Sequence, residues 1–260
     1  MMENLIMVSV IVIIALTGYS LRSLTVSGTA AAIITGIAIY AGFGVSGLIL
    51  LGVFFASSSL WSKYKSSQKI RIEEKLAKGS RRDWRQVAAN GGLAAVLGII
   101  NSFYELPVTL ICFLTALASA NSDTWASEIG SLSKGMPISL KTLKPVDKGT
   151  SGAVSLLGTI AALAGAFLIA VTGALLFKIS ASLAFLVFLL GFMGNLIDTF
   201  LGAYFQKVYK CPSCGLETEK AIHCGRAAER IRGLALLDND FVNFISGALA
   251  VILAVAVYGI

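Results

Sequence analysis

The segment "VTLICFLTALASANSDTWASEIG" (residues 108–130) runs from a stretch of apolar side chains directly into a polar stretch with two carboxylates, Asp123 and Glu128. The rest of the chain is similarly apolar: 56% of its 260 residues are hydrophobic, only 13% are charged, and the mean hydropathy is +0.82. Soluble domains carry about 25% charged residues. We therefore predict an all-α polytopic membrane protein, in which acids beside an apolar helix indicate a functional site.

Eight apolar segments are candidates for membrane helices. A spanning helix needs about 20 residues, so the short segments 87–100 and 106–120 form either two crossings or one re-entrant hairpin. The first segment lacks the basic region and cleavage site of a signal peptide, and we interpret it as a membrane helix. The eight segments are 5–19, 26–42, 45–60, 87–100, 106–120, 152–177, 181–205 and 241–260.

The distribution of Lys and Arg predicts the orientation. All but one of the 21 Lys and Arg residues lie in the loops after the first, third, fifth and seventh segments. Basic loops stay in the cytoplasm, so we predict both termini outside the cell membrane and a functional site on its cytoplasmic face. The net charge of +7 favours anionic partners such as phosphates, nucleotides or lipid headgroups. We predict no nucleic-acid partner; the oligomeric state stays open, with a homodimer as one arrangement.

Weak internal similarity suggests a duplication. The stretch 24–42 resembles 149–165, since both pass through a T-S-G-type turn into an apolar run, and 90–100 resembles 245–255. Within a single membrane domain, 1–260, the halves 1–103 and 104–260 would then be parallel four-helix repeats. Duplicated membrane folds place their binding sites at the interface between the repeats.

A second acidic motif resembles the first. Asn195 and Asp198 in "NLIDTF" are three residues apart and share one helical face. "NSDTW" at 121–125 has the same pattern at the end of another apolar segment. Such carboxylates could act as acid and base, as Mg²⁺ ligands or as a cation relay. The lysines that follow in the chain favour Mg²⁺ beside phosphates.

Two further stretches are candidates for phosphate binding. The first contains Lys141, Lys144 and Lys148 and then Gly149, Thr150 and Ser151, where we expect the sixth segment to begin; ordinary capping by a hydroxyl explains this turn equally well. The second, "GSRRDWRQVAANGG" (79–92), offers Arg82 and Asn90. Its arginines alone would also fit an amphipathic stretch on the membrane surface, but Asn90 lies inside an apolar run.

Three of the four cysteines lie close to the only histidine in "CPSCGLETEKAIHCG" (211–225). Cys211, Cys214, His223 and Cys224 supply four soft ligands within fourteen residues, which suits a closed tetrahedral Zn²⁺ site of structural type. Free thiols are the alternative, because a cytoplasmic position disfavours a disulfide. We call residues 207–235 the Cys/His loop.

Several motifs together resemble one integral membrane family, which contains the plant and cyanobacterial phytyl-phosphate kinases and an animal transmembrane protein. More distantly, the acidic motif with its following lysines resembles dolichol kinases and other CTP-using lipid kinases. The resemblance implies transfer of the γ-phosphoryl group of a nucleotide, with CTP as the donor, to a membrane isoprenoid monophosphate. The motifs are "LTVSG" (24–28), "GSRRDWRQVAANG" (79–91), "ANSDTWASEIG" (120–130), "KGTSGAVSLLGT" (148–159), "GNLIDTFLGAYFQ" (194–206), "HCG" (223–225) and "LDNDFVNFIS" (237–246).

The residues fit such a reaction. We expect Asp123, Glu128 and Asp198 to be catalytic and to bind Mg²⁺. The tail length of the isoprenoid and the nucleotide stay open. The side chains and turns expected to bind substrate or phosphate are Arg82, Asn90, Asn121, Ser122, Lys141, Lys144, Lys148, Gly149, Thr150, Ser151, Asn195, Asp240 and Asn243.

Two other functions compete with the kinase. A transporter or flippase for a phosphorylated lipid or an ion would explain the duplication and Asp198. It would need polar groups along the whole crossing, however, whereas the acids here gather at one side. A cytidylyltransferase acting on a lipid phosphate would differ from the kinase in its products, a CDP-lipid and pyrophosphate.

Overall fold

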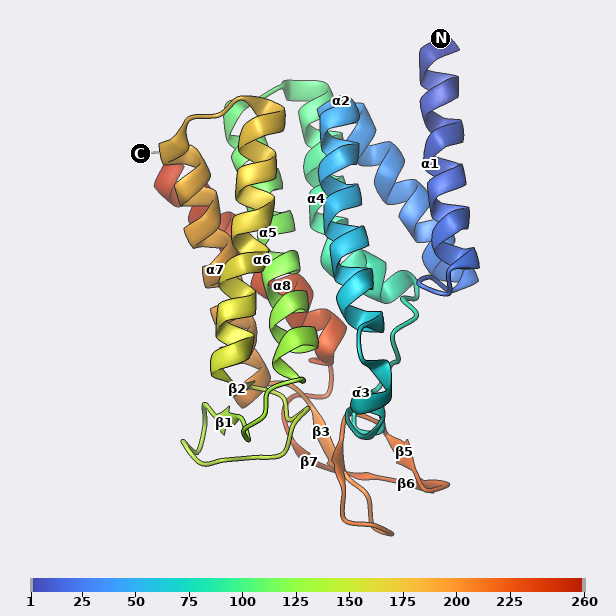
Figure 1. Cartoon of the computed structure of the whole chain (residues 1–260), viewed down its shortest axis with the longest axis vertical. Helices are drawn as coiled ribbons and strands as arrows, with labels where there is room; N and C mark the ends of the chain where they lie inside the picture. Colours follow the sequence, from blue (N-terminus) through green and yellow to red (C-terminus); the bar gives the residue numbers. More distant parts are fainter. Residues whose placement is uncertain (1, 259–260) are drawn as a thin grey trace.

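The computed structural model describes residues 2–258, apart from the side chains at 70, 71 and 73, and consists mainly of long helices (Figure 1). Six of these helices, α1, α2, α4, α6, α7 and α8, have the length and composition to cross a membrane. A mostly helical polytopic membrane protein is thereby confirmed, whereas the count of eight crossings, the side of the termini and the repeats stay predictions. The helices are α1 (Met2–Ser20), α2 (Val26–Lys63), α3 (Ser66–Glu73), α4 (Trp84–Tyr104), α5 (Pro107–Gly130), α6 (Leu156–Phe177), α7 (Ala181–Tyr204) and α8 (Asn239–Tyr258).

Helix α2 has 38 residues and folds back on itself at Gly44. Gly44 has φ 60° and ψ −153°, a conformation open to glycine and strained for other residues. At the far end of the helix, Lys63 Nζ donates to Leu21 O at 2.6 Å, so the second arm returns to the level where the first began. Both arms are visible in Figure 1. They correspond to the two apolar segments predicted at 26–42 and 45–60.

Helices α4 and α5 extend beyond the apolar runs that predicted them. They contain 21 and 24 residues, which makes them about 32 and 36 Å long at 1.5 Å per residue. Both lengths match the hydrocarbon thickness of about 30 Å and favour two crossings over a re-entrant hairpin. Helix α5 is not among the six candidate membrane helices, because the acidic motif in its second half lowers its mean hydropathy. It lies inside the bundle, where residues 111–119 are all buried by other helices.

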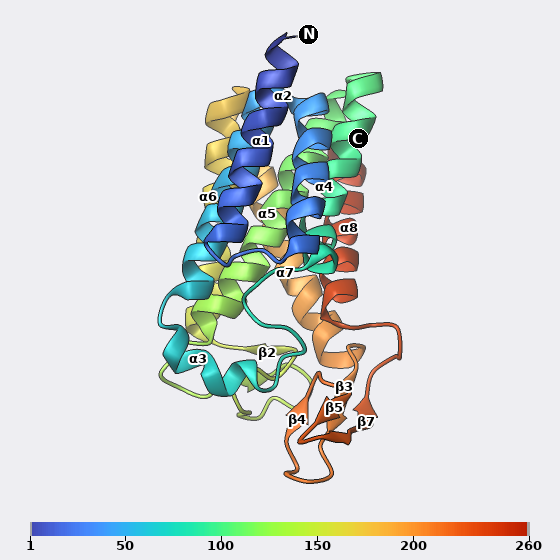
Figure 2. The same cartoon turned by 90° about the vertical axis from the view of Figure 1, so that its right-hand side faces the viewer.

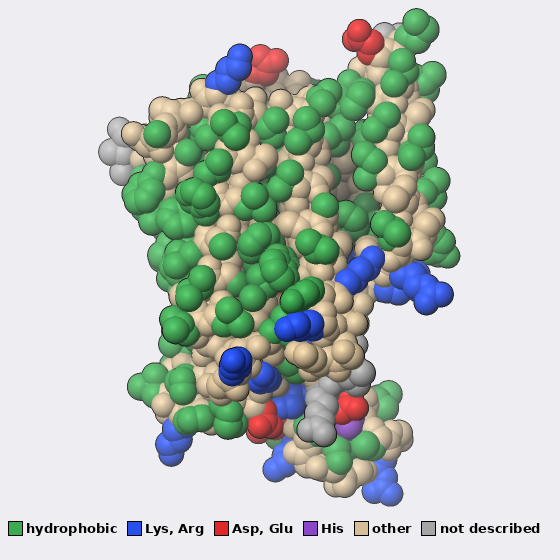
Figure 3. All heavy atoms as spheres, in the orientation of Figure 1, with side chains coloured by type: hydrophobic (Ala, Val, Ile, Leu, Met, Phe, Trp, Pro, Cys, Tyr) green, Lys and Arg blue, Asp and Glu red, His purple; other side chains and the backbone are tan. Residues whose placement is uncertain are grey.

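The half of the bundle away from the basic loops has an aromatic core. Phe43 and Phe113 stack with their ring centroids 4.1 Å apart, and Phe177 packs edge-on against both. Apolar side chains cover the outer surface of the helices, and most Lys and Arg side chains gather at the loop end (Figure 3). The same end of the bundle also bears exposed aromatic side chains, among them Trp84 and Phe241. Aromatic side chains are enriched where a membrane protein leaves the lipid.

Short strands in the loops depart from the all-α prediction. They lie beneath the helices, with α3, in Figure 2. Their pairing depends on loop contacts between residues far apart in the chain, which helical periodicity does not report. The strands form three small units. The first is the pair β1 (Ile138–Ser139) and β2 (Ala153–Val154). The second is a sheet in the order β4 (Glu217–Thr218), β3 (Val208–Lys210), β7 (Glu229–Arg232), and the third is the pair β5 (Ile222–His223) and β6 (Arg226–Ala227).

Candidate functional site

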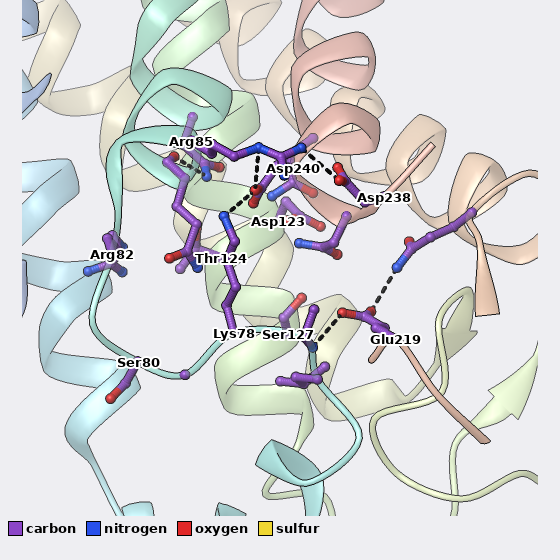
Figure 4. A pocket seen from close by; sticks show the side chains of 18 of the residues that line it. Lys78, Ser80, Arg82, Arg85, Asp123, Thr124, Ser127, Glu219, Asp238 and Asp240 are labelled. Atoms are coloured by element: carbon purple, nitrogen blue, oxygen red, sulfur yellow. Dashed lines mark hydrogen bonds and ion pairs between the residues drawn. The ribbon is translucent and has the colours of Figure 1, made fainter. Parts of the chain in front are cut away.

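A cavity of about 400 Å³ lies at the loop end of the bundle, between α2, α4, α5, α7, α8 and the Cys/His loop (Figure 4). Small-molecule sites usually have 300–1,000 Å³. Seven residues predicted for the site line this cavity: Arg82, Asn90, Asp123, Glu128, Asp198, Asp240 and Asn243. The cavity is therefore the place where the separate motifs of the sequence meet.

Two carboxylates in the cavity lack a cation. Asp123 on α5 and Asp198 on α7 lie within hydrogen-bonding distance of each other. Their other partners are neutral: Asn195 Nδ2 donates to Asp123 at 3.3 Å, and Ser246 Oγ donates to Asp198 at 3.1 Å. Within the described residues, neither acid forms a salt bridge. Two buried carboxylates facing each other are unfavourable unless a cation or a proton joins them.

Glu128, the third predicted acid, is already paired. Lys69 Nζ lies 2.6 Å from its Oε2, and Ser62 Oγ donates to its Oε1 at 2.6 Å. The ammonium group also donates to Trp61 O at 2.7 Å, and only 4% of Lys69 is exposed. The charge of Glu128 is thus neutralised by a buried lysine that the sequence did not single out.

Arg82 is the counterpart of the acid pair, because its guanidinium lacks a carboxylate within 4 Å among the described side chains. It donates to Ser59 Oγ at 2.9 Å and Ser62 Oγ at 3.5 Å, and lies 5.7 Å from the Phe55 ring centroid. Burial lowers the pKa of Arg82, and the negative charge of Glu128 counteracts this. Two backbone hydrogen bonds to residues 23 and 25 hold the arginine in place.

The other cations around the cavity all have acidic partners. Lys78 lies 2.7 Å from Asp83 and 2.5 Å from Asp240. Figure 4 shows the contact between Lys78 and Asp240. Arg85 lies 2.7 Å from Asp238, and Lys207 lies 3.4 Å from the same carboxylate. Four further residues line the cavity although the sequence did not single them out: Lys69, Lys78, Lys207 and Glu219. In the sequence, these three lysines are signals of membrane orientation.

The predicted lysine-rich site lies elsewhere. Lys141 and Lys144 are exposed in the loop after α5, and Lys148 donates to Ser133 O; none of the three lines the cavity. The turn at Gly149, Thr150 and Ser151 does not line it either. The expectation that this turn begins the sixth helix is wrong. Helix α6 begins at Leu156 with Ser155 as its cap, because Gly149 (φ 79°) and Gly152 (φ 74°) adopt left-handed conformations that interrupt a helix.

Asn121 and Ser122 join helices instead of lining the cavity. Asn121 Nδ2 donates to Gly165 O at 2.8 Å, and its Oδ1 accepts from Ser57 and Ser58 at 3.2 Å. Ser122 Oγ donates to Ala162 O at 2.9 Å. Both side chains are fully buried. They fix the position of α5, and with it that of the neighbouring Asp123.

The Cys/His loop brings its four predicted ligands together. The ligand atoms of Cys211, Cys214, His223 and Cys224 all lie within 4.8 Å of one another. Cys224 Sγ lies 3.9 Å from Cys214 Sγ and 3.3 Å from His223 Nδ1. In a tetrahedron with Zn–S bonds of about 2.3 Å, neighbouring ligands are about 3.8 Å apart. The four side chains could therefore hold Zn²⁺ with little rearrangement.

Comparisons with known proteins identify the family of the chain and several related proteins. The family model described as "Integral membrane protein DUF92" matches residues 9–251. Protein PGR of Arabidopsis thaliana is 34% identical over 90% of this chain and 88% of its own. An uncharacterised membrane protein of Methanocaldococcus jannaschii is 35% identical over 79% and 86%. The chloroplastic protein VTE6 of Arabidopsis thaliana is 28% identical over 89% of this chain and 64% of its own. No solved structure matches.

Proposed function

The chain belongs to the DUF92 family of integral membrane proteins, the family that its motifs resemble, and we propose that it is a prenyl-phosphate kinase. One observation carries the proposal: among the side chains that the structure describes, a single cavity contains an acid pair with no cation within salt-bridge distance and a half-buried arginine with no carboxylate within that distance. A phosphate group with a bound divalent cation would satisfy both. The resemblance to phytyl-phosphate kinases supplies the reaction and the class of acceptor.

The acid pair fits Mg²⁺. Magnesium prefers oxygen ligands and is usually bound by one or two carboxylates together with phosphates and water. Asp123 and Asp198 offer such oxygens, and Asn195 holds the first of them in position. Glu128 is less suited, because Lys69 already balances its charge. We therefore assign Mg²⁺ to the two aspartates; when bound, it would neutralise negative charge on phosphoryl oxygens.

The transfer itself needs positioning more than proton removal. The second pKa of a phosphate monoester is about 6, so the acceptor oxygen is largely anionic at neutral pH. This oxygen forms a bond to the γ-phosphorus, the bond from that phosphorus to the β–γ bridging oxygen breaks, and the electron pair leaves with the nucleoside diphosphate. Arg82 would bind phosphate oxygens through its free N–H groups. Lys78, Arg85 and Lys207, which already have acidic partners, would donate hydrogen bonds to the triphosphate. The donor would be CTP, in analogy to related lipid kinases.

The position of the cavity suits an amphiphilic acceptor. It lies at the end of the bundle, near exposed Trp84 and Phe241, where the lipid tail can remain among the helices or in the membrane. The phosphate can then reach Arg82 at the cavity wall. We propose that this is the cytoplasmic face of the cell membrane, since the basic loops lie on the same side.

We further propose that the Cys/His loop contains a structural Zn²⁺. Within this cluster, hydrogen bonds from the backbone and from His223 outweigh burial and lower the pKa of Cys211 to about 6, whereas the neighbouring cysteines raise the pKa of Cys224 to about 11. Cys211 is therefore the thiol that ionises first, and metals bind the thiolate form. With four protein ligands, the site is closed and leaves no position for a substrate.

The decisive test is a product assay on purified protein. Labelled CTP, ATP or GTP is incubated with Mg²⁺ and farnesyl, geranylgeranyl or phytyl monophosphate, and the lipid products are identified by mass. We expect a prenyl diphosphate and a nucleoside diphosphate. A CDP-lipid with pyrophosphate would instead identify a cytidylyltransferase. Folded protein that yields neither product with any tail or nucleotide would refute the kinase, and transport assays in vesicles would then test the flippase.

A further inference from the structure

Residues 74–83, here called the strap, connect α3 to α4 across the mouth of the cavity. Their side chains and backbone form one wall, from Leu76 to Ser80 and again at Arg82 (Figure 4). The strap carries Lys78, which lies between two carboxylates, and Arg82, the cation without an acidic partner. Its position therefore decides where two of the cavity's positive charges lie.

The end of the strap next to α4 is fixed by the membrane helices. Arg82 N donates to Ser23 O at 3.0 Å, and Thr25 N donates to Arg82 O at 3.0 Å. Asp83 caps α4 by accepting from Gln86 N at 3.0 Å. This end is therefore held in place without contacts from the Cys/His loop.

The other end of the strap is held by the Cys/His loop. Three hydrogen bonds, here called the clamp, join them: Glu219 N donates to Lys75 O at 2.8 Å, Thr218 Oγ1 donates to the same oxygen at 2.7 Å, and Ala77 N donates to Glu219 Oε2 at 3.2 Å. No helix of the bundle makes these bonds. The clamp therefore depends on where β4 and residue 219 lie.

Glu219 is itself firmly positioned. Gln206 Nε2 donates to its Oε1 at 2.7 Å, and Ser151 Oγ donates to the same oxygen at 3.3 Å. Burial raises the pKa of Glu219, and the hydrogen bonds from Ala77, Ser151 and Gln206 act in the opposite direction. A buried glutamate between three segments of the chain thus serves as their common acceptor.

The clamp lies inside the segment that the four metal ligands close. Thr218 and Glu219 stand between the ligands Cys214 and His223, and β4 has only two residues. Strands this short have little stability by themselves. Two features constrain the shape of this segment: β4 pairs with β3, and the cluster of cysteines and histidine draws residues 211, 214, 223 and 224 to one point.

We propose that the Cys/His centre positions the free end of the strap: metal bound there fixes Thr218 and Glu219, these hold residues 75–77, and the strap then presents Lys78 to the cavity. Thr218 and Glu219 are thus positioning residues. The role goes beyond the proposed kinase activity, because it holds for any anion that the cavity binds.

Hydrogen exchange of the whole protein in detergent tests this without a substrate. Thr218→Val/Glu219→Ala, here called the clamp variant, removes the two clamp bonds made by side chains and leaves the backbone bond and the four ligands, and Cys214→Ser removes one ligand. We expect the clamp variant to retain one zinc per chain while the amides of the strap exchange about tenfold to a hundredfold faster, the range for losing hydrogen bonds to a charged group. Cys214→Ser should lose zinc and accelerate the same amides to a similar extent.

The combined variant gives the sharpest result. If the metal acts through the clamp, adding Cys214→Ser to the clamp variant accelerates the strap amides far less than adding it to the wild type does. Glu217→Gln, two residues from Glu219 and without a bond to the strap, is the matched control and should exchange like the wild type. Titration with Mg²⁺-pyrophosphate should show a similar loss of affinity in all variants except this control.

Two results would overturn the proposal. In the first, a chelator that removes zinc from folded wild-type protein accelerates exchange within 207–235 only. In the second, the clamp variant leaves the strap amides at wild-type rates while retaining zinc. The chelator experiment covers the case in which Cys214→Ser fails to fold. Loss of kinase activity alone decides nothing here, so failure of the kinase proposal and failure of this one are distinguishable.

Discussion

Helix α5 carries two acids that line the same cavity, and their surroundings are opposite. Glu128 faces the buried ammonium of Lys69 at 2.6 Å, whereas Asp123 faces a second carboxylate, Asp198, and an amide. The first arrangement is complete without a ligand. The pair of Asp123 and Asp198 needs a bound cation or a proton to balance its charge. Acids five residues apart on one helix can therefore serve stability in one case and binding in the other.

The same contrast applies to the arginine and lysines. Lys78 is neutralised by Asp83 and Asp240, while the side-chain partners of Arg82 among the described residues are hydroxyl groups. An unbalanced group in a folded protein lowers stability unless its ligand compensates for it. Removing a balanced group should therefore weaken the fold, and removing an unbalanced one should weaken function while sparing the fold.

The largest effect is expected at the unbalanced pair. Asp123→Asn should lower turnover by about a hundredfold to a thousandfold, comparable to losing a key electrostatic group in a transition state. It should also raise Tm in the absence of Mg²⁺, because it removes repulsion between two buried carboxylates. Turnover and thermal unfolding with and without Mg²⁺ test this. Full activity would contradict the metal role, and a lower Tm without Mg²⁺ would show that the two carboxylates do not repel each other in the folded protein.

At the balanced pair we expect the opposite result. Glu128→Gln should lower the free energy of unfolding by about 3 kcal/mol, because it leaves the charge of Lys69 buried and unpaired. Lys69→Met should do the same. The double variant should recover much of the loss, which a double-mutant cycle in detergent would measure. If Glu128→Gln abolishes turnover at unchanged stability, Glu128 acts in binding or catalysis instead.

Arg82 gives a smaller and more selective effect. Arg82→Lys keeps the charge but loses the planar fork that binds two phosphate oxygens. We expect KM for the prenyl monophosphate to rise by about tenfold, with a smaller change in kcat, as for one lost charge-assisted hydrogen bond. Arg81→Lys is the matched control, since Arg81 donates to Leu24 O and lies outside the cavity lining. Equal effects of both changes would remove the specific role of Arg82.

Part of this contrast could be predicted from the sequence. The motifs "NSDTW" and "NLIDTF" indicated that Asp123 and Asp198 belong together, and they do meet. The spacing of the cysteines indicated their cluster. The structure brings both groups of side chains together, while the metals that they would bind stay predictions.

The balancing charges could not be predicted in this way. Lys78 and Asp240 are separated by 162 residues, and only the packing of the bundle brings them together. The lysines at 141–148 looked more suitable for phosphate than those at 69 and 78, because they follow the acidic motif in the chain. In the structure, none of the three lysines at 141–148 lines the cavity. The path of the loops in the folded protein therefore decides which lysine or arginine reaches a site. Local sequence patterns do not predict that path.

The smallest expected effect is at Asp238, a balanced acid at the rim of the cavity. Burial acts to raise its pKa, but the N–H of Phe241 and the guanidinium of Arg85 outweigh this, and the pKa of Asp238 is lowered. A lowered folded-state pKa contributes stability above the unfolded value of about 3.9, and this is lost as the pH falls through the folded value. Tm should therefore not change through this group between pH 7 and 5, and should fall below about pH 4. Asp238→Asn should have a lower Tm at pH 7 and a smaller fall in acid. If the Tm of Asp238→Asn falls in acid as much as that of the wild type, the pair of Asp238 and Arg85 contributes nothing to stability. Neutralised charges at the rim of the cavity would then matter less than the buried Lys69–Glu128 pair.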